Sequence, residues 1–176
     1  MAENALTRLD LGCGDNVREG FTGVDKFKTG STDIEADLFV FPWPFEADSV
    51  DEVHCSHFFE HVPKELRAPF MCELHRVMKK GATAQFITPC GDRALQDATH
   101  EWPPIVAGSY LYFNADWRKA NKLQHGYYDI AADFDYSYGY GLDPQVAVRN
   151  ADFQAFAVKH YNNAVSDLHV TLTKRG

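Results

Sequence analysis

The chain has 176 residues, with 17 basic and 25 acidic side chains, and its formal net charge is −8. This length suits one domain with its own core, and 45% hydrophobic against 24% charged residues excludes a disordered chain. No apolar run is long enough to span a membrane, and the acidity argues against a large surface for duplex nucleic acid.

The cysteines and the N-terminal segment bear on the compartment. The four cysteines, at positions 13, 55, 72 and 90, form no CxxC pair, which favours reduced thiols over a disulfide framework or a zinc knuckle. The first ten residues lack the basic-then-apolar pattern of a signal peptide. We therefore expect a cytoplasmic protein.

The first half of the chain alternates apolar runs with helical or loop patterns. Strands are predicted at residues 6–11, 21–24, 32–38, 50–55 and 82–88. Residues 63–79 have apolar side chains at three- and four-residue steps, which predicts an amphipathic helix with Gly81 as its C-cap. Strands that alternate in this way with other segments indicate an α/β fold with a parallel sheet.

The last third of the chain differs in composition. Residues 97–150 contain seven of the eight tyrosines, at positions 110, 112, 127, 128, 136, 138 and 140. Two closing strands are predicted at residues 155–160 and 167–173. We expect one domain over residues 1–176 with an aromatic-rich loop or insert region at about 90–150. Its tyrosines either form an aromatic acceptor pocket or pack half-buried with their hydroxyls in water.

Two glycines and two acids follow the first three predicted strands. Gly12 and Gly14 lie just past the first strand, where the absence of side chains lets a ligand approach the backbone. Asp25 ends the second strand, and its carboxylate can accept hydrogen bonds from both ribose hydroxyls. Asp37 ends the third strand and can accept a hydrogen bond from an exocyclic amine. The alternative is that the four are turn and capping residues. As a set they suit an adenosyl ligand across the carboxyl edge of the sheet.

With these residues the sequence resembles the class I S-adenosylmethionine-dependent methyltransferases, most closely small "type 11"-like members with a shortened N-terminal region. The resemblance extends from about residue 6 to 89 and rests on these stretches: Leu9-Asp10-Leu11-Gly12-Cys13-Gly14, Gly23-Val24-Asp25, Ala36-Asp37-Leu38, Pro44-Phe45, Ser49-Val50-Asp51-Glu52-Val53, Ser56-His57, Glu60-His61-Val62 and Glu73-Leu74-His75-Arg76-Val77-Met78-Lys79-Lys80-Gly81. It implies a Rossmann-like fold whose mostly parallel sheet has an antiparallel last strand.

The resemblance also implies the cofactor, S-adenosylmethionine, the product S-adenosylhomocysteine, and the residues that bind them. Asp10, Gly12 and Gly14 would line the methionine side together with Cys13, and Asp25 would hold the ribose beside Lys26. The remaining expected contacts are Asp37 and Leu38 at the adenine and Ser56 and His57 at the methionine end.

The sequence departs from the family pattern at its beginning. Asn16 occupies the usual third glycine position, and only about ten residues separate Gly14 from Asp25, too few for a normal crossover helix. We expect a first helix of one turn or none. We also expect no N-terminal helix over the cofactor, and a second subunit could cover the open edge, as in a homodimer.

Several residues are candidates for acceptor chemistry. His57 and His61 match an HxxEH zinc pattern, but helix-start hydrogen bonding of Glu60 and His61 is favoured, and no metal site is predicted. His100 and His57 are candidate catalytic bases, each with a purely structural alternative. Tyr110 and Tyr112 are candidate substrate-binding residues.

The sequence thus predicts methyl transfer from S-adenosylmethionine to an acceptor that it does not identify. The acidic, tyrosine-rich composition favours a small-molecule acceptor over nucleic acid. Two alternatives stay open: a non-catalytic module that binds the adenosyl ligand, and a methyltransferase acting on a nucleic-acid base.

Overall fold

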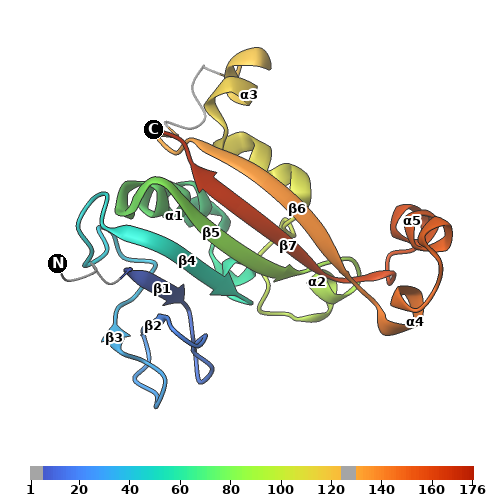
Figure 1. Ribbon diagram of the computed structural model, residues 1–176, viewed down its shortest axis with the longest axis horizontal. Helices are drawn as coiled ribbons and strands as arrows, with labels where there is room; N and C mark the ends of the chain where they lie inside the picture. The colour runs from blue at the N-terminus through green and yellow to red at the C-terminus, as the bar shows by residue number, and fades with distance from the viewer. Residues whose placement is uncertain (1–5, 124–129) are drawn as a thin grey trace.

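The computed structural model describes residues 6–123 and 130–176 (Figure 1). Its seven strands are β1 (Arg8–Leu11), β2 (Thr22–Asp25), β3 (Ile34–Glu35), β4 (Val50–Ser56), β5 (Met78–Pro89), β6 (Phe134–Leu142) and β7 (Val165–Lys174). Its helices are α1 (Lys64–Val77), α2 (Arg93–Gln96), α3 (Ala115–Ala120), α4 (Pro144–Ala147) and α5 (Ala151–His160), with 3-10 turns η1 (Phe59–His61) and η2 (Ala107–Phe113). None of these helices is long and apolar enough to cross a membrane.

The strands form one sheet in the order β3-β2-β1-β4-β5-β7-β6. The first five strands along this order pair in parallel, β7 pairs antiparallel with β5, and β6 pairs antiparallel with β7. This arrangement confirms the predicted α/β sheet with an antiparallel last strand. The carboxyl ends of the parallel strands share one edge, so the loops that follow β1, β2, β4 and β5 meet there.

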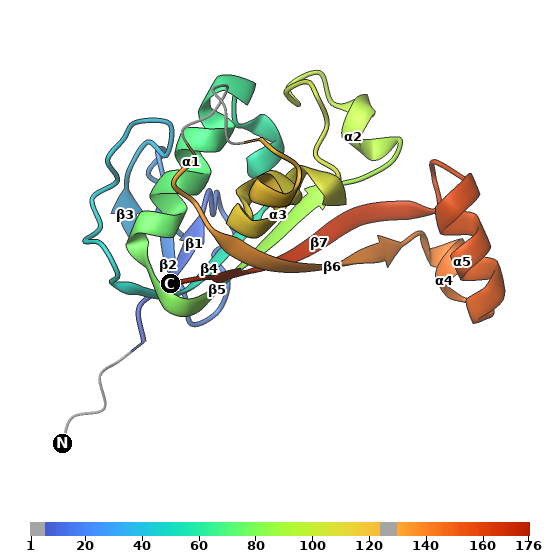
Figure 2. The ribbon, with the colours of Figure 1, turned by 90° about the horizontal axis from the view of Figure 1, so that it is seen from above.

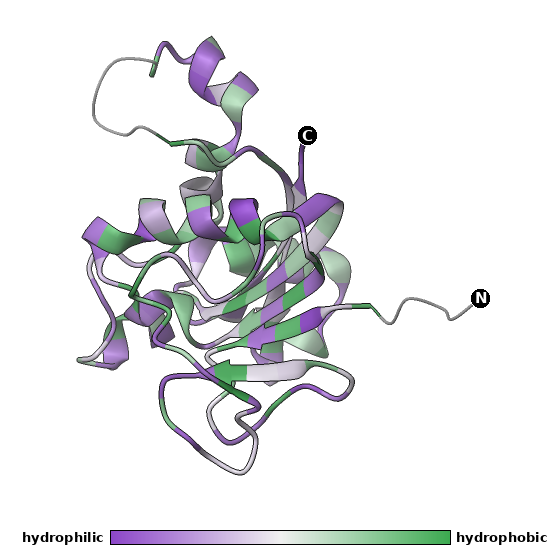
Figure 3. Cartoon of the chain, turned by 90° about the vertical axis from the view of Figure 1, so that its left-hand side faces the viewer, coloured by the Kyte–Doolittle hydropathy of each residue, from purple (hydrophilic) through white to green (hydrophobic). Residues whose placement is uncertain are grey.

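The helices that pack on the central sheet lie on one of its faces. Figure 2 shows α1 and α3 on the same side of the strands. On β5, Ala84 and Phe86 are buried, whereas Gln85 between them is exposed. Figure 3 shows this alternation of apolar and polar residues along the strands. The core therefore lies between α1 and one face of the sheet, and the loops at the carboxyl edge are anchored in it.

The connection between β1 and β2 contains no helix, as predicted. Residues 12–21, all of them described, form turns and irregular loop. The carbonyl of Val24 accepts a hydrogen bond from the Gly12 N–H at 2.8 Å, and Arg18 donates its backbone N–H to the Asp10 carboxylate at 2.7 Å. These bonds hold a short loop in the place where a crossover helix would stand.

The predicted end of the first long helix is wrong. The helix ends at Val77, and Met78 already has extended backbone and pairs with Val50 as the first residue of β5. Gly81 lies inside β5 with a φ of +78°, where the register to β4 shifts, so it is not the helix C-cap. Pairing with β4 ends the helix at Val77, two residues before the predicted end at residue 79.

The segment predicted as a strand at residues 155–160 is helical. Asn150 caps α5 by accepting a hydrogen bond from the Phe153 N–H at 2.9 Å, and the helix continues to His160. The strand next to β7 is instead β6, which carries Tyr136, Tyr138 and Tyr140 within the region expected to form loops. The far ends of β6 and β7 extend from the body of the sheet and carry α4 and α5 (Figure 2).

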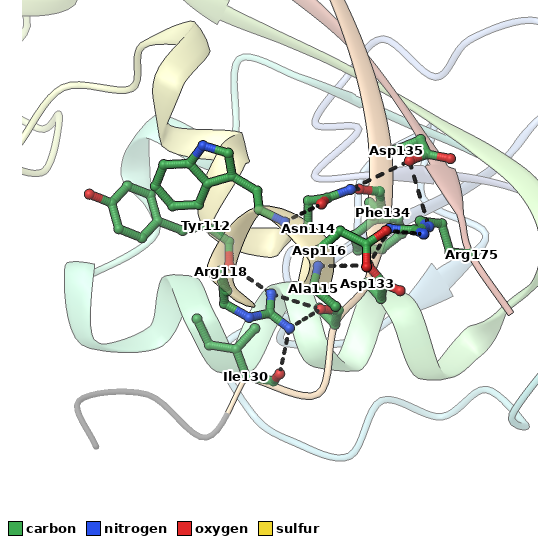
Figure 4. A network of polar contacts seen from close by, with 12 residues as sticks. Tyr112, Asn114, Ala115, Asp116, Arg118, Ile130, Asp133, Phe134, Asp135 and Arg175 are labelled. Atoms are coloured by element: carbon green, nitrogen blue, oxygen red, sulfur yellow. Dashed lines mark hydrogen bonds and ion pairs between the residues drawn. The ribbon is translucent and has the colours of Figure 1, made fainter. Parts of the chain in front are cut away.

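A polar network fastens α3 to the end of β7 (Figure 4). The Arg118 guanidinium donates to the carbonyls of Tyr112, Ile130 and Ala132 at 2.8–3.1 Å. Arg175 forms ion pairs with three acids of the same region: Asp116, Asp133 and Asp135. This network stabilises the insert at a distance from the carboxyl-edge loops that carry the predicted site residues.

Candidate functional site

Two cavities lie at the carboxyl edge of the sheet. Of the two residues that directly follow β4, His57 lines the larger cavity and Phe58 lines the smaller one. The small cavity measures about 20 Å³ and is lined by Asp25, Lys26, Ala36, Asp37, Leu38, Phe39 and Phe58. The large cavity measures about 560 Å³, and its lining includes His57, Glu60, His61, Arg93, Asp97 and His100. The predicted adenosyl contacts Asp25, Lys26, Asp37 and Leu38 therefore come together at the small cavity, and the two candidate catalytic histidines come together at the large one.

Asp25 organises the glycine turn. Its carboxylate accepts the Gly14 N–H at 3.0 Å and the Phe27 N–H at 2.9 Å. Gly14 has a φ of +52°, and a Cβ added to it would meet no atom within 4 Å. The turn therefore presents backbone to open space beside a carboxylate, an arrangement that suits a polar ligand with hydroxyl groups.

Asp10 and Cys13 face the interior of the protein. The two Asp10 oxygens bond the Arg18 N–H at 2.7 Å and His54 Nδ1 at 2.9 Å, and the side chain is buried. Burial raises the pKa of the Cys13 thiol, which donates weakly to the Ser31 carbonyl. Through its side chain, Asp10 shapes the loop between β1 and β2.

Phe58 is a site residue that the sequence reasoning missed. A Cβ at Gly12 would lie 2.2 Å from Phe58 Cδ2, so the position requires glycine because this ring packs directly on it. Phe58 also contacts Phe39, with ring centroids 5.8 Å apart. The aromatic residue directly after Ser56-His57 was the available signal.

The large cavity joins two segments that are distant in sequence. His57 lies just after β4, at a φ of +52°, and its Nδ1 is 3.5 Å from Oε1 of Glu60. His100 arrives from the loop after α2, and its ring centroid is 5.0 Å from that of His61. Glu60 is buried, and burial raises the pKa of its carboxyl group. Glu60 and His61 were expected to form hydrogen bonds at a helix start. For Glu60 this expectation is wrong, because neither of its carboxylate oxygens has a hydrogen-bond partner among the described residues, and both residues border this cavity instead.

The two candidate substrate-binding tyrosines lie elsewhere. Tyr110 is buried in the core against Phe59 and Phe86, and neither cavity includes it. Tyr112 is exposed and packs on Trp117 of α3. Tyr127 and Tyr128 are outside the described residues. The structure therefore does not bring the described candidates Tyr110 and Tyr112 to the predicted cofactor contacts.

Most of the carboxyl edge fits an adenosyl ligand. Asp25 and the open Gly14 backbone suit the ribose and the polar methionine end. The small cavity, by contrast, has about the volume that one water molecule needs. An adenine ring therefore enters between Leu38 and Phe58 only if the Phe58 or Phe39 ring moves aside.

Comparison with known proteins agrees with this geometry. Residues 24–86, from β2 to near the end of β5, match the family model of a methyltransferase domain. No curated protein matches the sequence. The matched segment contains Asp25, Asp37 and the Glu60-His61 pair.

Solved structures resemble the whole chain. A S-adenosylmethionine-dependent methyltransferase from Archaeoglobus fulgidus aligns with a TM-score of 0.63 at 16% identity, over 97% of this chain and 87% of that one. One from Mesorhizobium loti aligns with a TM-score of 0.55 at 17% identity, over 97% and 91%. A putative methyltransferase in complex with the Haloferax volcanii Trm112 activator has a TM-score of 0.51 at 14% identity, over 99% and 84%.

At these identities the structural likeness shows the fold, which is that of the class I methyltransferases. The family match independently covers the strands and loops that build the small cavity. The match to a methyltransferase domain over residues 24–86 and the fold shared with S-adenosylmethionine-dependent methyltransferases both agree with the resemblance found in the sequence.

Proposed function

We propose that the chain transfers the methyl group of S-adenosylmethionine to a small molecule bound in the large cavity. The observation that carries this proposal is the position of His57 and Phe58. These consecutive residues line the large and the small cavity, respectively, so a donor in one site and an acceptor in the other meet at the end of β4.

The lining of the small cavity and the glycine turn support the proposed cofactor contacts. Asp25 would hold the ribose hydroxyls, Asp37 and Leu38 would contact the adenine, and Lys26 borders the same space. Gly12, Cys13 and Gly14 would offer backbone to the methionine part, with Ser56 and His57 at its end. Asp10 would act indirectly, because its carboxylate already holds the loop between β1 and β2.

Methyl transfer from a sulfonium requires the protein mainly to position the donor and the acceptor. The sulfonium of the donor is already activated, so an acceptor atom in line with the methyl group displaces S-adenosylhomocysteine directly. Proximity and alignment then supply most of the acceleration. His57 and His100 line the large cavity, and we propose that both contact the acceptor there.

The properties of the large cavity favour a small molecule. Its volume of about 560 Å³ lies within the common range for small-ligand sites. Arg93, which borders it, is 3.3 Å from Asp167 and so is paired with an acid of this chain. With a net charge of −8, the chain offers little of the electrostatic attraction on which nucleic-acid binding relies.

Methyl transfer from radiolabelled S-adenosylmethionine tests the proposal. We would assay a panel of small hydroxyl and amine acceptors beside a mixed RNA and DNA sample. We expect label in a small molecule, and we expect His100→Ala to lower turnover at least about tenfold while its affinity for S-adenosylhomocysteine is unchanged. Label in nucleic acid alone, or cofactor binding without transfer to any acceptor, would refute the proposed acceptor class.

A further inference from the structure

Three metal-ligating side chains converge in the large cavity. One ligand atom from each of Glu60, His61 and His100 lies within 4.8 Å of the other two. Glu60 and His61 belong to η1, whereas His100 comes from the loop after α2. The cluster exists only because the fold brings these two segments together.

The Glu60 carboxylate has unmet bonding capacity. The residue is 5% exposed, and neither carboxylate oxygen finds a hydrogen-bond partner among the residues that the structure describes. The nearest basic atom is Nδ1 of His57, at 3.5 Å from Oε1. A buried carboxylate without partners is costly, and a bound cation would remove that cost.

The Nδ1 atoms of both imidazoles lie near backbone carbonyl oxygens. His61 Nδ1 is 3.2 Å from the Thr99 carbonyl, and His100 Nδ1 is 3.1 Å from the Ala94 carbonyl. A carbonyl oxygen only accepts hydrogen bonds, so these contacts favour a hydrogen on each Nδ1, and a neutral ring then has the lone pair of Nε2 available to a metal. Metal-binding histidines typically donate their second ring N–H to a carbonyl or carboxylate in this way.

Arg67 fixes the two segments relative to one another. Its guanidinium donates to the Val62 carbonyl at 3.1 Å, to the Glu101 carbonyl at 2.8 Å and to the Pro103 carbonyl at 2.6 Å. The Glu101 N–H in turn donates to the Glu60 carbonyl at 2.9 Å. These bonds hold the loop that contains His100 against η1, so the three ligands are organised in advance.

We propose that Glu60, His61 and His100 bind one divalent transition-metal ion, of which Zn²⁺ is the best-matched example. Two imidazoles and one carboxylate are a ligand set of catalytic zinc sites, which leave one position open. At metal–ligand lengths of about 2.0–2.2 Å, the three side chains close by roughly 1 Å on binding. This site rests on the proposed function in one respect: the open position would hold an oxygen of the acceptor, so His100 would act on the acceptor through the ion.

Titration of the metal-free chain with ZnCl₂, followed by calorimetry, tests the site without any methyl transfer. We expect one Zn²⁺ per chain, and we expect Glu60→Gln and His100→Ala each to weaken binding at least about tenfold. Glu65→Gln on α1 and His160→Ala on α5 are matched controls that remove the same groups from exposed positions and should leave the affinity unchanged. Equal affinity in the wild type, Glu60→Gln and His100→Ala would overturn the proposal.

Co²⁺ identifies the ligands independently. We expect visible absorption without the intense near-ultraviolet band of thiolate ligation, because no cysteine is in the set. A thiolate band would overturn the assignment. Binding of S-adenosylhomocysteine, measured on the wild type and the same variants, separates the two proposals. If the wild type did not bind S-adenosylhomocysteine, the proposed function would be refuted. If it bound S-adenosylhomocysteine but not Zn²⁺, only the metal site would be refuted.

Discussion

The small cavity beside β2 and the large cavity beyond β4 lie next to each other but differ in size, lining and origin. The small cavity is built by three short segments that follow β2, β3 and β4, and aromatic rings nearly fill it. The large cavity is polar and depends on contact between η1 and a loop about 40 residues later. The strand ends of the fold thus form the proposed donor side, whereas the long insert completes the proposed acceptor side.

The largest expected effect concerns the support of the small cavity. The buried Glu73 accepts the Trp43 N–H at 2.7 Å and pairs with Arg76 at 2.6 Å, and Trp43 Nε1 donates to the Leu38 carbonyl. Glu73→Ala should lower the free energy of unfolding by about 3–4 kcal/mol, because it leaves a partly buried charge and a buried N–H unpaired. Urea denaturation measures this, with exposed Glu65→Ala as the control; equal losses would contradict the assignment.

The contribution of Glu73 to the free energy of unfolding should also depend on pH. Burial opposes ionisation of its carboxyl group, but hydrogen bonds from Arg76 and the Trp43 N–H outweigh burial, so the pKa of Glu73 lies below its ordinary value of 4.5. Its stabilising contribution is therefore present above pH 4.5 and is lost as the pH falls through the lowered pKa. Between these values the wild type should lose stability more steeply than Glu73→Gln. Parallel stability curves for the two proteins would show that this ion pair does not carry the effect.

The next largest effect is on the cofactor. Asp25→Ala should weaken binding of S-adenosylhomocysteine by about 2–3 kcal/mol, roughly a hundredfold, because the turn N–H groups and the ribose lose a charged acceptor. Asp15→Ala removes an exposed acid from the same turn and should have little effect. Unchanged affinity in Asp25→Ala would place the ribose elsewhere.

A smaller effect should distinguish the contacts that position the large cavity from similar contacts elsewhere in the insert. Arg67→Met removes the bonds that hold the loop containing His100 and should cost about 2 kcal/mol of stability and lower Zn²⁺ affinity. Arg118→Met breaks a similar set of carbonyl contacts in the network of Figure 4 and should cost stability without changing Zn²⁺ affinity. Thermal melts and zinc titration measure both quantities. If the two variants lost zinc affinity equally, the effect would be general loosening rather than positioning.

The smallest effect concerns Tyr110. Its hydroxyl is buried without a hydrogen-bond partner among the described residues, and burial raises its pKa well above the ordinary value. Tyr110→Phe should therefore leave stability unchanged or raise it by up to about 1 kcal/mol, with normal turnover. A tenfold drop in turnover at constant cofactor affinity would restore Tyr110 as an acceptor contact.

The small cavity could be predicted because its residues directly follow strands. Asp25 and Asp37 lie within two residues of β2 and β3, so local pattern and the rule for sheet edges suffice to bring them together. Phe58 was missed because its packing on Gly12 is a tertiary contact across 46 residues, which no local pattern encodes.

The large cavity and the end of the chain were less predictable for the same reason. His57 and His100 are each candidates from the sequence, but burial of the Glu60 carboxylate near them is a tertiary property that the sequence pattern does not show. Residues 155–160 have a strand-like pattern by themselves, whereas the cap that starts their helix, Asn150, lies five residues before them. Gly81 by itself is a signal for the end of a helix. The helix ends before it, at Val77, because Met78 pairs with Val50 in the sheet.

Calorimetric titration with S-adenosylhomocysteine tests the donor site at the carboxyl edge most directly. We expect the wild type to bind one ligand per chain, Asp25→Ala to bind it roughly a hundredfold more weakly, and His100→Ala to bind it as the wild type does. No binding by the wild type at millimolar ligand, or equal losses in Asp25→Ala and His100→Ala, would contradict the division of this edge into a donor and an acceptor cavity.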